Sequence, residues 1–432
     1  MDKRFYQEPS RTIPWRREVD VIVAGAGPAG IAAALAAARQ GARTALLEAQ
    51  GALGGVWTSG LLSWIIDAGD KPGIMREITA ALEARGARAP KGRNFAYDVE
   101  EMKVLLEELA AAEGIHVRLH TRVCAVVREG RAMRAVITES KSGREVFGAE
   151  VFIDASGDGD LAAQAGCRFA YGDPKSGRAQ PMSLIALVTG IHAGEIPAFV
   201  GGGVLEAKVN LFDEFRRAGV SPSYSRPTLF RIRDDLFALM ANHEYGVSPM
   251  DADEITRSTI HARAELRTLV AALRRRGGPW SGLRIVATGA QIGVREGRRV
   301  AGRYEVSADD IFAGRRHEDG ICRVHAGIDV HSVDPGASTA YQRPHGDRAS
   351  LPYDIPLRAL IAADVDGLMM AGRCISGDFL AHSSYRMTGN AVAMGEAAGI
   401  TAALAAARGV APHELAWENV APFLPGARTV VA

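Results

Sequence analysis

The sequence predicts a protein of the α/β class, with a three-layer domain around a central parallel sheet and a second, inserted α+β domain. Three observations lead to this prediction. A short apolar strand, an Ala-rich helix and a second strand follow one another from residue 19 onward. A similar strand and Ala-rich helix return near the C-terminus, while Pro, Gly, Arg and aromatic residues interrupt the shorter segments between them. We therefore expect a discontinuous first domain, residues 1–171 and 352–432, and an inserted domain at residues 172–351.

The elements of the first half are indicated by apolar periodicity. Val19–Ala24 is a continuous apolar, β-branched run of the kind found in buried parallel strands. Pro28–Gln40 is Ala-rich and predicts a helix, and Arg43–Leu47 predicts the next strand. Asp98–Glu113 has apolar residues at helical spacing, and His116–Val127 predicts a further strand.

The later elements follow the same rules. Ala132–Glu139 alternates like one strand of a hairpin, and Glu150–Ala155 is another apolar strand. Arg257–Arg276 predicts the clearest helix of the inserted domain. Gly367–Ala371 and Asn390–Ala407 predict the strand and the helix that return to the first domain.

Composition and charge exclude several classes of protein. The chain has 432 residues, with 51 Lys+Arg and 50 Asp+Glu, so the formal net charge is +1 and gives no general attraction to nucleic acid or to anionic membranes. The four cysteines form no C-x-x-C pair, which argues against a disulfide framework or a zinc site. No long, strongly apolar stretch predicts a membrane span. We expect a cytoplasmic protein.

The loop Gly25-Ala26-Gly27-Pro28-Ala29-Gly30 is a G-x-G-x-x-G fingerprint between the first strand and the first helix, as in Rossmann-like dinucleotide-binding folds. Gly25 permits the tight turn, Gly27 lets the backbone approach a pyrophosphate, and Gly30 lets the helix pack on the strand. The carboxylate of Glu48, at the end of the second strand and followed by Ala49, suits the hydroxyls of an adenosine ribose and would repel a 2′-phosphate. The sequence therefore predicts a dinucleotide site.

A second glycine cluster, Gly51–Gly60, favours FAD over NAD. A ligand that continues past the pyrophosphate requires the chain to pass close to it, and Gly54 and Gly55 permit that approach. The alternative is an ordinary flexible loop.

At this point the sequence resembles the FAD-dependent oxidoreductase family, whose FAD-binding domain is of the glutathione-reductase type and whose layout is related to the fumarate reductase and aspartate oxidase flavoproteins. The resemblance is carried by the following stretches: Val21–Gly30 with Glu48, Leu53–Leu61, Ile153–Ala162, Ile292–Arg299, Tyr353–Pro356, Gly372–Ser376 and Met394–Gly399. It implies that residues 1–171 and 352–432 bind FAD and that residues 172–351 contribute the substrate-binding cap.

The resemblance also implies cofactor roles for matched positions. Val123 would contact adenine through its backbone, Ala155 and Gly157 would line the adenosine side, and Gly372 and Arg373 would approach the ribityl and the pyrophosphate. A helix that begins near Gly389 and Asn390 would point its N-terminus at the N1/C2=O edge of the flavin, where reduced flavin is negatively charged.

Four residues are candidates for the chemistry. His382 and His331 are candidate bases, because a neutral imidazole can take a hydroxyl proton while a hydride leaves to flavin N5. Arg295 is a candidate for binding a carboxylate or a developing charge, and Arg386 for binding substrate or the flavin pyrimidine. Each has a structural alternative, a hydrogen-bonded histidine or an ion-paired arginine. Cys374, next to the predicted flavin segment, is either a small buried residue or a covalent attachment point.

These residues predict an FAD-dependent oxidoreductase that transfers hydride from a small polar molecule, such as a hydroxylated or sugar-like compound, to flavin N5. A flavin monooxygenase or halogenase with an external reductant is one alternative, although the sequence has no second G-x-G-x-x-G for a nicotinamide cofactor. An electron carrier or a non-redox flavoprotein is another. No metal site is expected, since Asp158 and Asp160 fit a turn after a strand. The apolar, Pro-containing segment Val410–Ala432 is compatible with docking on its own chain or in a homo-oligomer.

Overall fold

The computed structural model describes residues 6–88, 92–335 and 348–425. Its largest sheet has seven strands, with β5, β2, β1, β8, β7 and β6 in spatial order and β17 beside β8. The strands of this sheet are β1 (Trp15–Ala24), β2 (Thr44–Leu47), β5 (His116–Arg118), β6 (Arg122–Glu129), β7 (Ala132–Ser140), β8 (Gly143–Asp154) and β17 (Leu368–Met370). The chain thus leaves this sheet after β8 and returns to it at β17, which confirms the predicted α/β class.

The central sheet is mixed, because it combines the predicted parallel strands with antiparallel strands at the predicted hairpin. Strands β5, β2, β1, β8 and β17 are parallel, whereas β6 and β7 are antiparallel neighbours joined to β8 by hairpins. Gly130 in the first turn and Gly143 at the start of β8 have φ values of 60° and 82°, which glycine adopts most easily. The predicted single strand His116–Val127 is two strands, because His120 between them has a φ of 51° and interrupts the extended backbone.

Helices α1 (Pro28–Arg39) and α9 (Thr388–Arg408) pack against each other beside the sheet. Their contact depends on two glycines in α9: a Cβ on Gly395 would lie 2.0 Å from the carbonyl oxygen of Ala29, and a Cβ on Gly399 would lie 2.1 Å from that of Ala33. The predicted Ala-rich character of both helices therefore serves a close backbone approach.

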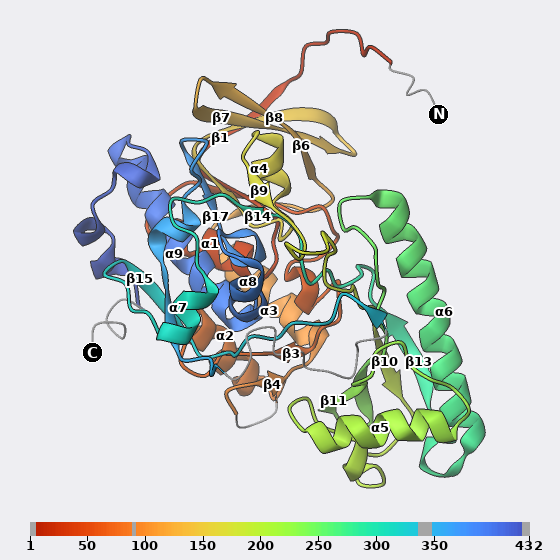
Figure 1. Cartoon of the computed structure of the whole chain (residues 1–432). Helices are drawn as coiled ribbons and strands as arrows, with labels where there is room; N and C mark the ends of the chain where they lie inside the picture. The colour runs from red at the N-terminus through yellow and green to blue at the C-terminus, as the bar shows by residue number, and fades with distance from the viewer. Residues whose placement is uncertain (1–5, 89–91, 336–347, 426–432) are drawn as a thin grey trace.

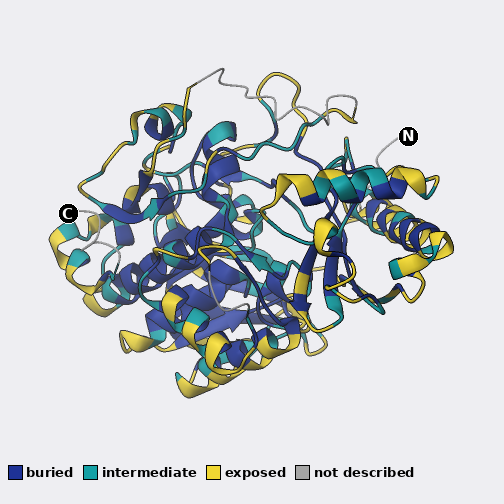
Figure 2. Cartoon of the chain, turned by 90° about the horizontal axis from the view of Figure 1, so that it is seen from below, coloured by how far each residue is buried: buried dark blue, intermediate teal, exposed yellow. Residues whose placement is uncertain are grey.

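Among the described residues, α9 is the one helix long and apolar enough to cross a membrane by length and composition. In the structure 72% of its apolar window is buried inside the protein, where α9 forms part of the core. Figure 2 shows the same distribution, with buried residues concentrated in the interior and exposed residues on outer turns.

A second, four-stranded antiparallel sheet lies away from the first, together with the two long helices α5 and α6 (Figure 1). Its strands are β11 (Thr228–Arg233), β12 (Leu236–Met240), β10 (Ile185–Thr189) and β13 (Arg284–Thr288), in this spatial order. Its helices are α5 (Leu205–Arg217) and α6 (Ala252–Arg276). These elements confirm the predicted second, α+β part of the fold.

The two faces of the second sheet have different partners. On β10 the side chains of Ala186 and Val188 join α5 and α6 in a second hydrophobic core, while those of Ile185 and Leu187 belong to the first core. This alternation has the period of two that a strand buried on both faces requires. The face that carries Ile185 is therefore turned toward the first domain.

The second core extends only from Met182 to Ile292, so it is narrower than the predicted inserted segment. Apolar residues from Val300 onward belong to the first core. At the C-terminal end, Val420 and Leu424 are buried in the first core, so this part of the chain docks on its own molecule.

The remaining elements connect or cover the two sheets. The helices are α2 (Ile74–Ala84), α3 (Val99–Ala112), α4 (Asp160–Gln164), α7 (Ala308–Ala313) and α8 (Phe379–Tyr385). The strands are β3 (Trp64–Ile65), β4 (Phe95–Ala96), β9 (Phe169–Ala170), β14 (Arg299–Val300), β15 (Gly320–Val324) and β16 (Tyr353–Pro356).

Candidate active site

A cavity of about 1130 Å³ extends from the carboxyl ends of the parallel strands to the inner face of the second sheet. At one end it is lined by the loop after β1, including Gly25 and Gly27, and by Glu48 after β2. At the other end it is lined by Ile185 and Phe230 of the second sheet. Ligands of open α/β sheets bind at the carboxyl ends of the strands, so this cavity is the candidate active site.

The fingerprint loop has the geometry that its glycines predict. Gly25 has a φ of 95°, and a Cβ on Gly30 would lie 1.8 Å from the carbonyl oxygen of Gly25. Gly27 differs from both, because a Cβ there would meet no protein atom within 4 Å. Since protein packing does not require a glycine at position 27, the open space beside it suits the approach of a ligand. Gly55 passes close to Gly27 and lines the cavity as well.

The buried carboxylate of Glu48 is held by the backbone on both sides. Oε2 accepts a hydrogen bond from the N–H of Ala26 at 2.6 Å, and Oε1 accepts one from the N–H of Gln50 at 2.7 Å. The carboxylate therefore has a fixed orientation on the cavity wall, with lone pairs left for ribose hydroxyls.

Most of the predicted cofactor positions line the cavity, and four do not: Gly30, Gly54, Gly389 and Asn390. The lining positions are Gly25, Gly27, Pro28, Ala29, Glu48, Ala49, Gly55, Val123, Ala155, Gly157, Gly372 and Arg373. Gly30 and Gly54 instead permit packing inside the protein, since a Cβ on Gly54 would lie 2.7 Å from the Thr58 side chain. Gly389 lies against the backbone of Asp67, and a Cβ on Gly389 would be 2.3 Å from the Asp67 carbonyl oxygen.

Helix α9 begins at Thr388, earlier than the predicted start near Asn390, and Thr388 itself lines the cavity. Within the described part of the chain, the Thr388 hydroxyl and the Arg373 Nε, both on residues that line the cavity, have no hydrogen-bond partner. Buried polar groups normally have partners, so orphaned ones around a cavity point to a polar ligand. Together with the fingerprint loop and Glu48, these groups fit FAD.

Arg295 lies at the far end of the cavity, and its guanidinium is buried. Its Nη1 donates to the carbonyl of Pro181 at 2.6 Å and to the hydroxyl of Ser183 at 2.9 Å. No carboxylate of the described residues lies within ion-pair distance of it. Burial and the neighbouring Arg386 lower the pKa of Arg295 to about 10, so it is still a cation at neutral pH.

His331 lies in the same part of the cavity and is part of a row of polar side chains. Its Nε2 is 3.3 Å from Oδ2 of Asp329, and its Nδ1 is 3.2 Å from Nε2 of His243. Nδ1 of His243 is in turn 3.0 Å from the hydroxyl of Tyr245. All four residues line the cavity. Burial, followed by the charge of Arg295, lowers the pKa of His331 to about 4 and that of His243 well below the ordinary value.

The residue patterns along the chain did not single out His243, Tyr245 or Asp329. His243 and Tyr245 lie three and five residues after the end of the apolar strand β12, and Asp329 stands two residues before His331. Polar residues that follow a buried strand could have pointed to His243 and Tyr245. Nothing in the sequence showed that this segment meets the one with Asp329 and His331.

The structure places the two other predicted catalytic residues differently. Arg386 lines the cavity, and its Nη2 is 3.3 Å from Oδ2 of Asp329. His382 is fully buried in α8 and is not a lining residue. Neither of its ring nitrogens has a hydrogen-bond partner among the described residues, and burial lowers its pKa well below the ordinary value. Cys374 is also fully buried away from the cavity.

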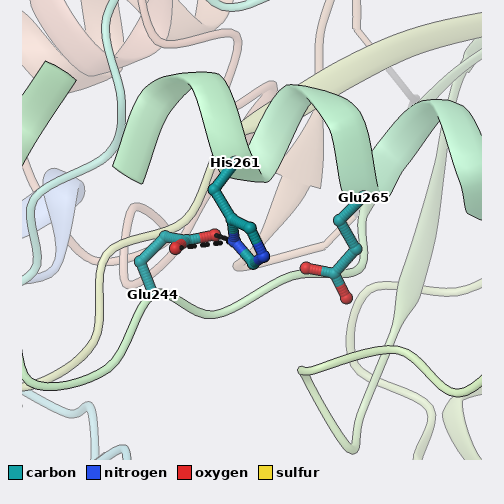
Figure 3. A group of neighbouring side chains, drawn as sticks. All are labelled: Glu244, His261 and Glu265. Carbon is teal, nitrogen blue, oxygen red and sulfur yellow. Dashed lines mark hydrogen bonds and ion pairs between the residues drawn. The ribbon is translucent and has the colours of Figure 1, made fainter. Parts of the chain in front are cut away.

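A second polar cluster supports the row from outside (Figure 3). Glu244 lies 3.0 Å from Nδ1 of His261 on α6, with Glu265 one helical turn further on. Glu265 accepts hydrogen bonds from the backbone N–H and the hydroxyl of Ser223, and that hydroxyl accepts one from the N–H of His243. These acids have partners in the protein, and the cluster anchors the segment that carries His243.

The fold and the cavity define a flavoprotein of the Rossmann-like class. A profile of the family described as FAD dependent oxidoreductase matches residues 20–424. The chain belongs to this family of FAD-dependent oxidoreductases, and the family implies a small-molecule substrate. A comparison with curated proteins gives no match.

Solved structures with a TM-score of 0.50 show the same fold at low sequence identity. A geranylgeranyl bacteriochlorophyll reductase-like protein from Thermoplasma acidophilum has a TM-score of 0.50 and 13% identity over 96% of this chain and 83% of its own. A triple mutant of the flavin-dependent brominase Bmp2 has a TM-score of 0.50 and 13% identity over 94% and 83%. The OxyS anhydrotetracycline hydroxylase from Streptomyces rimosus has a TM-score of 0.49 and 15% identity over 96% and 68%.

Proposed function

We propose that this FAD-dependent oxidoreductase oxidises a small hydroxylated carboxylate. The observation that carries the proposal is the buried Arg295 guanidinium, which opens into the cavity without a carboxylate partner in the described protein. A buried cation with no carboxylate in direct contact is costly, and a ligand carboxylate would relieve that cost through charge-assisted hydrogen bonds.

The other charges at this end of the cavity support an anionic substrate. The described lining there contains Lys208, Arg226, Arg295 and Arg386 but only one carboxylate, that of Asp329. The lining carboxylates of Glu48, Asp158 and Asp160 belong to the segments that follow β2 and β8, at the predicted nucleotide end. A cavity in which one sign of charge predominates raises the local concentration of ligands of the opposite sign.

In this reaction FAD, Arg295 and the side chains at His331 have separate roles. Bound FAD supplies the hydride acceptor at N5 of its isoalloxazine ring. Arg295 holds the substrate carboxylate and thereby fixes the orientation of the carbon to be oxidised. The row of side chains at His331 removes the hydroxyl proton, since its imidazoles are neutral at physiological pH.

The test is anaerobic bleaching of the yellow holoprotein. Linear and cyclic 2-hydroxy acids and sugar acids are added to one set of samples, and the corresponding neutral amides are added to a matched set. We expect carboxylates to bleach the flavin and the amides to be much slower. Equal bleaching by both sets, or by neither, would contradict the proposal.

A second candidate is a flavin monooxygenase or halogenase with an external reductant. The likeness to the flavin-dependent brominase supports this candidate, although at 13% identity it concerns the fold. In that case no substrate bleaches the flavin anaerobically. Instead, an organic substrate stimulates oxygen uptake when NADPH or a chemical reductant is supplied.

A further inference from the structure

The row Tyr245–His243–His331–Asp329 joins two distant parts of the chain. His243 and Tyr245 follow β12 of the second sheet, whereas Asp329 and His331 belong to the segment after β15. The three successive contacts measure 3.0, 3.2 and 3.3 Å, so each pair is close enough for one hydrogen to be shared.

Asp329 determines the direction of these hydrogen bonds. Burial would raise the pKa of Asp329, but the nearby His331, Arg386 and Arg295 outweigh it and hold the pKa below the ordinary value. An ionised carboxylate only accepts, so the hydrogen of neutral His331 is on Nε2, facing Asp329. The Nδ1 of His331 then carries a lone pair and must accept.

The tautomer of His331 also fixes the hydrogen positions of His243 and Tyr245. Because His331 Nδ1 accepts, His243 must carry its hydrogen on Nε2 and leave a lone pair on Nδ1. The hydroxyl of Tyr245 then donates to that Nδ1. Tyr245 also lies 3.4 Å from the carbonyl of Ser223, but donation there would reverse the row and place a lone pair of His331 against the Asp329 carboxylate.

With these tautomers both imidazoles use their free lone pairs inside the row. Among the four groups, the Tyr245 oxygen is the neutral atom that keeps an unused lone pair, and Tyr245 lines the cavity. A substrate hydroxyl can therefore donate its proton to the Tyr245 oxygen while the hydrogen bonds between the four side chains are kept.

We propose that Tyr245 is the catalytic residue that accepts the hydroxyl proton of the substrate, and that His243 and His331 relay a proton toward Asp329. This inference rests on the proposed function and names its base. The substrate O–H bond breaks and a new O–H bond forms on Tyr245. The original Tyr245 proton moves to Nδ1 of His243, and the Nε2 proton of His243 moves to Nδ1 of His331.

The charges balance at the end of the row. His331 becomes an imidazolium that is paired with the Asp329 carboxylate, Tyr245 and His243 are neutral again, and the electron pair of the broken bond stays on the substrate oxygen. That oxygen forms the carbonyl as the hydride leaves the neighbouring carbon for bound FAD. Burial, Arg295 and Arg386 disfavour an imidazolium at His331, and the Asp329 carboxylate offsets part of that cost.

The first test uses no substrate. Nuclear magnetic resonance of holoprotein labelled with nitrogen-15 histidine reports the tautomer of each ring, and the variants His243→Asn and His331→Asn assign the signals. We expect both rings to be neutral with the hydrogen on Nε2 at neutral pH, and Asp329→Asn to release His331 into a mixture of tautomers. A hydrogen on Nδ1 of His331, or an imidazolium at neutral pH, would overturn the inference.

The second test measures the anaerobic rate of flavin reduction by a hydroxy acid that bleaches the wild type. Tyr245→Phe removes one oxygen, and we expect a rate about 10² to 10⁴ times lower with an unchanged Kd for the carboxylate. The matched control is Tyr304→Phe, because Tyr304 bonds Asp310 and does not line the cavity. A wild-type rate and pH profile in Tyr245→Phe would overturn the role of Tyr245.

The two tests separate the inference from the proposed function. If no hydroxy acid bleaches the flavin but both histidines show the Nε2 tautomer, the proposed function fails while the direction of the row stands. If hydroxy acids bleach the flavin and the tautomers are reversed, the proposed function stands and the relay is wrong.

Discussion

His243 and His331 lie with Nε2 and Nδ1 3.2 Å apart, although 88 positions separate them in the chain. Their contact joins the second sheet to the segment that leads back to the first domain. It gives the cavity the one pair of facing imidazoles among its described lining residues.

Removal of the Glu48 carboxylate should weaken FAD binding. In Glu48→Ala the ribose loses its acceptor and the N–H groups of Ala26 and Gln50 lose theirs. Hydrogen bonds to charged groups contribute about 1.5–3 kcal/mol each, so we expect an FAD Kd about 10 to 100 times higher in a fluorescence titration. Glu18→Ala, at an exposed position of β1, is the control. Equal Kd values for the two variants would rule out this role of Glu48.

Replacement of Arg295 by Met should reduce the affinity for carboxylate substrates selectively. The charge is lost while much of the side-chain volume is kept, and we expect a Kd about 10 to 100 times higher for a hydroxy acid. The affinity for the neutral amide of the same compound should not change. Ligand titration of the flavin spectrum measures both values, and a parallel loss for acid and amide would indicate a general structural effect instead.

Alanine at Gly395 or Gly399 should destabilise the fold by separating α1 from α9. The new Cβ atoms would lie 2.0 and 2.1 Å from backbone oxygens that cannot move independently. Overpacking of this kind costs about 1–3 kcal/mol or more, which chemical denaturation can measure. Gly194→Ala, where a Cβ meets no atom within 4 Å, should change the free energy of unfolding by less than about 0.5 kcal/mol.

Glu396 should make stability depend on pH. Burial raises its pKa from 4.5 to about 7, so the folded state holds this proton more tightly than the unfolded state. The stabilisation is complete below about pH 4.5 and is lost as the pH rises through about 7. The free energy of unfolding of the wild type should therefore fall between about pH 5 and pH 8 relative to Glu396→Gln, by up to about 3 kcal/mol. A pH-independent difference between the two proteins would show that Glu396 does not titrate in this range.

Acid precipitation should release the flavin into the supernatant. Cys374 is fully buried, its Sγ contacts the carbonyl of Asp154 at 3.3 Å, and it does not line the cavity. Burial also raises the pKa of the thiol well above its ordinary value, which suppresses the reactive thiolate. The spectrum of the supernatant measures the result, and a yellow pellet would require a covalent link elsewhere.

The nucleotide end of the cavity was predictable because its determinants are local. Gly25, Gly27 and Gly30 lie within one turn, and Glu48 ends the next strand, so strand and helix periodicity is sufficient to bring them together. The bounds of α1, α3 and α9 agree with the predicted helices to within about two residues for the same reason.

The proposed substrate end of the cavity was only partly predictable. His331, Arg295 and Arg386 were candidates by residue type, and the structure brings all three to the cavity. His382 was also a candidate by residue type, but helix α8 directs its side chain into the protein interior. Whether a histidine in a helix faces a cavity or the core depends on the packing of that helix.

Residue patterns along the chain thus determine the α/β class, the dinucleotide loop and the preference for FAD, because each depends on neighbours within one strand–turn–helix unit. The tertiary structure alone decides that Tyr245 and His243 meet His331 and Asp329. Each segment carries its polar residues for no local reason, and hydrogen bonds between them form only when the second sheet packs against the returning chain. The direction in which those bonds point follows from the charge of one buried carboxylate, Asp329.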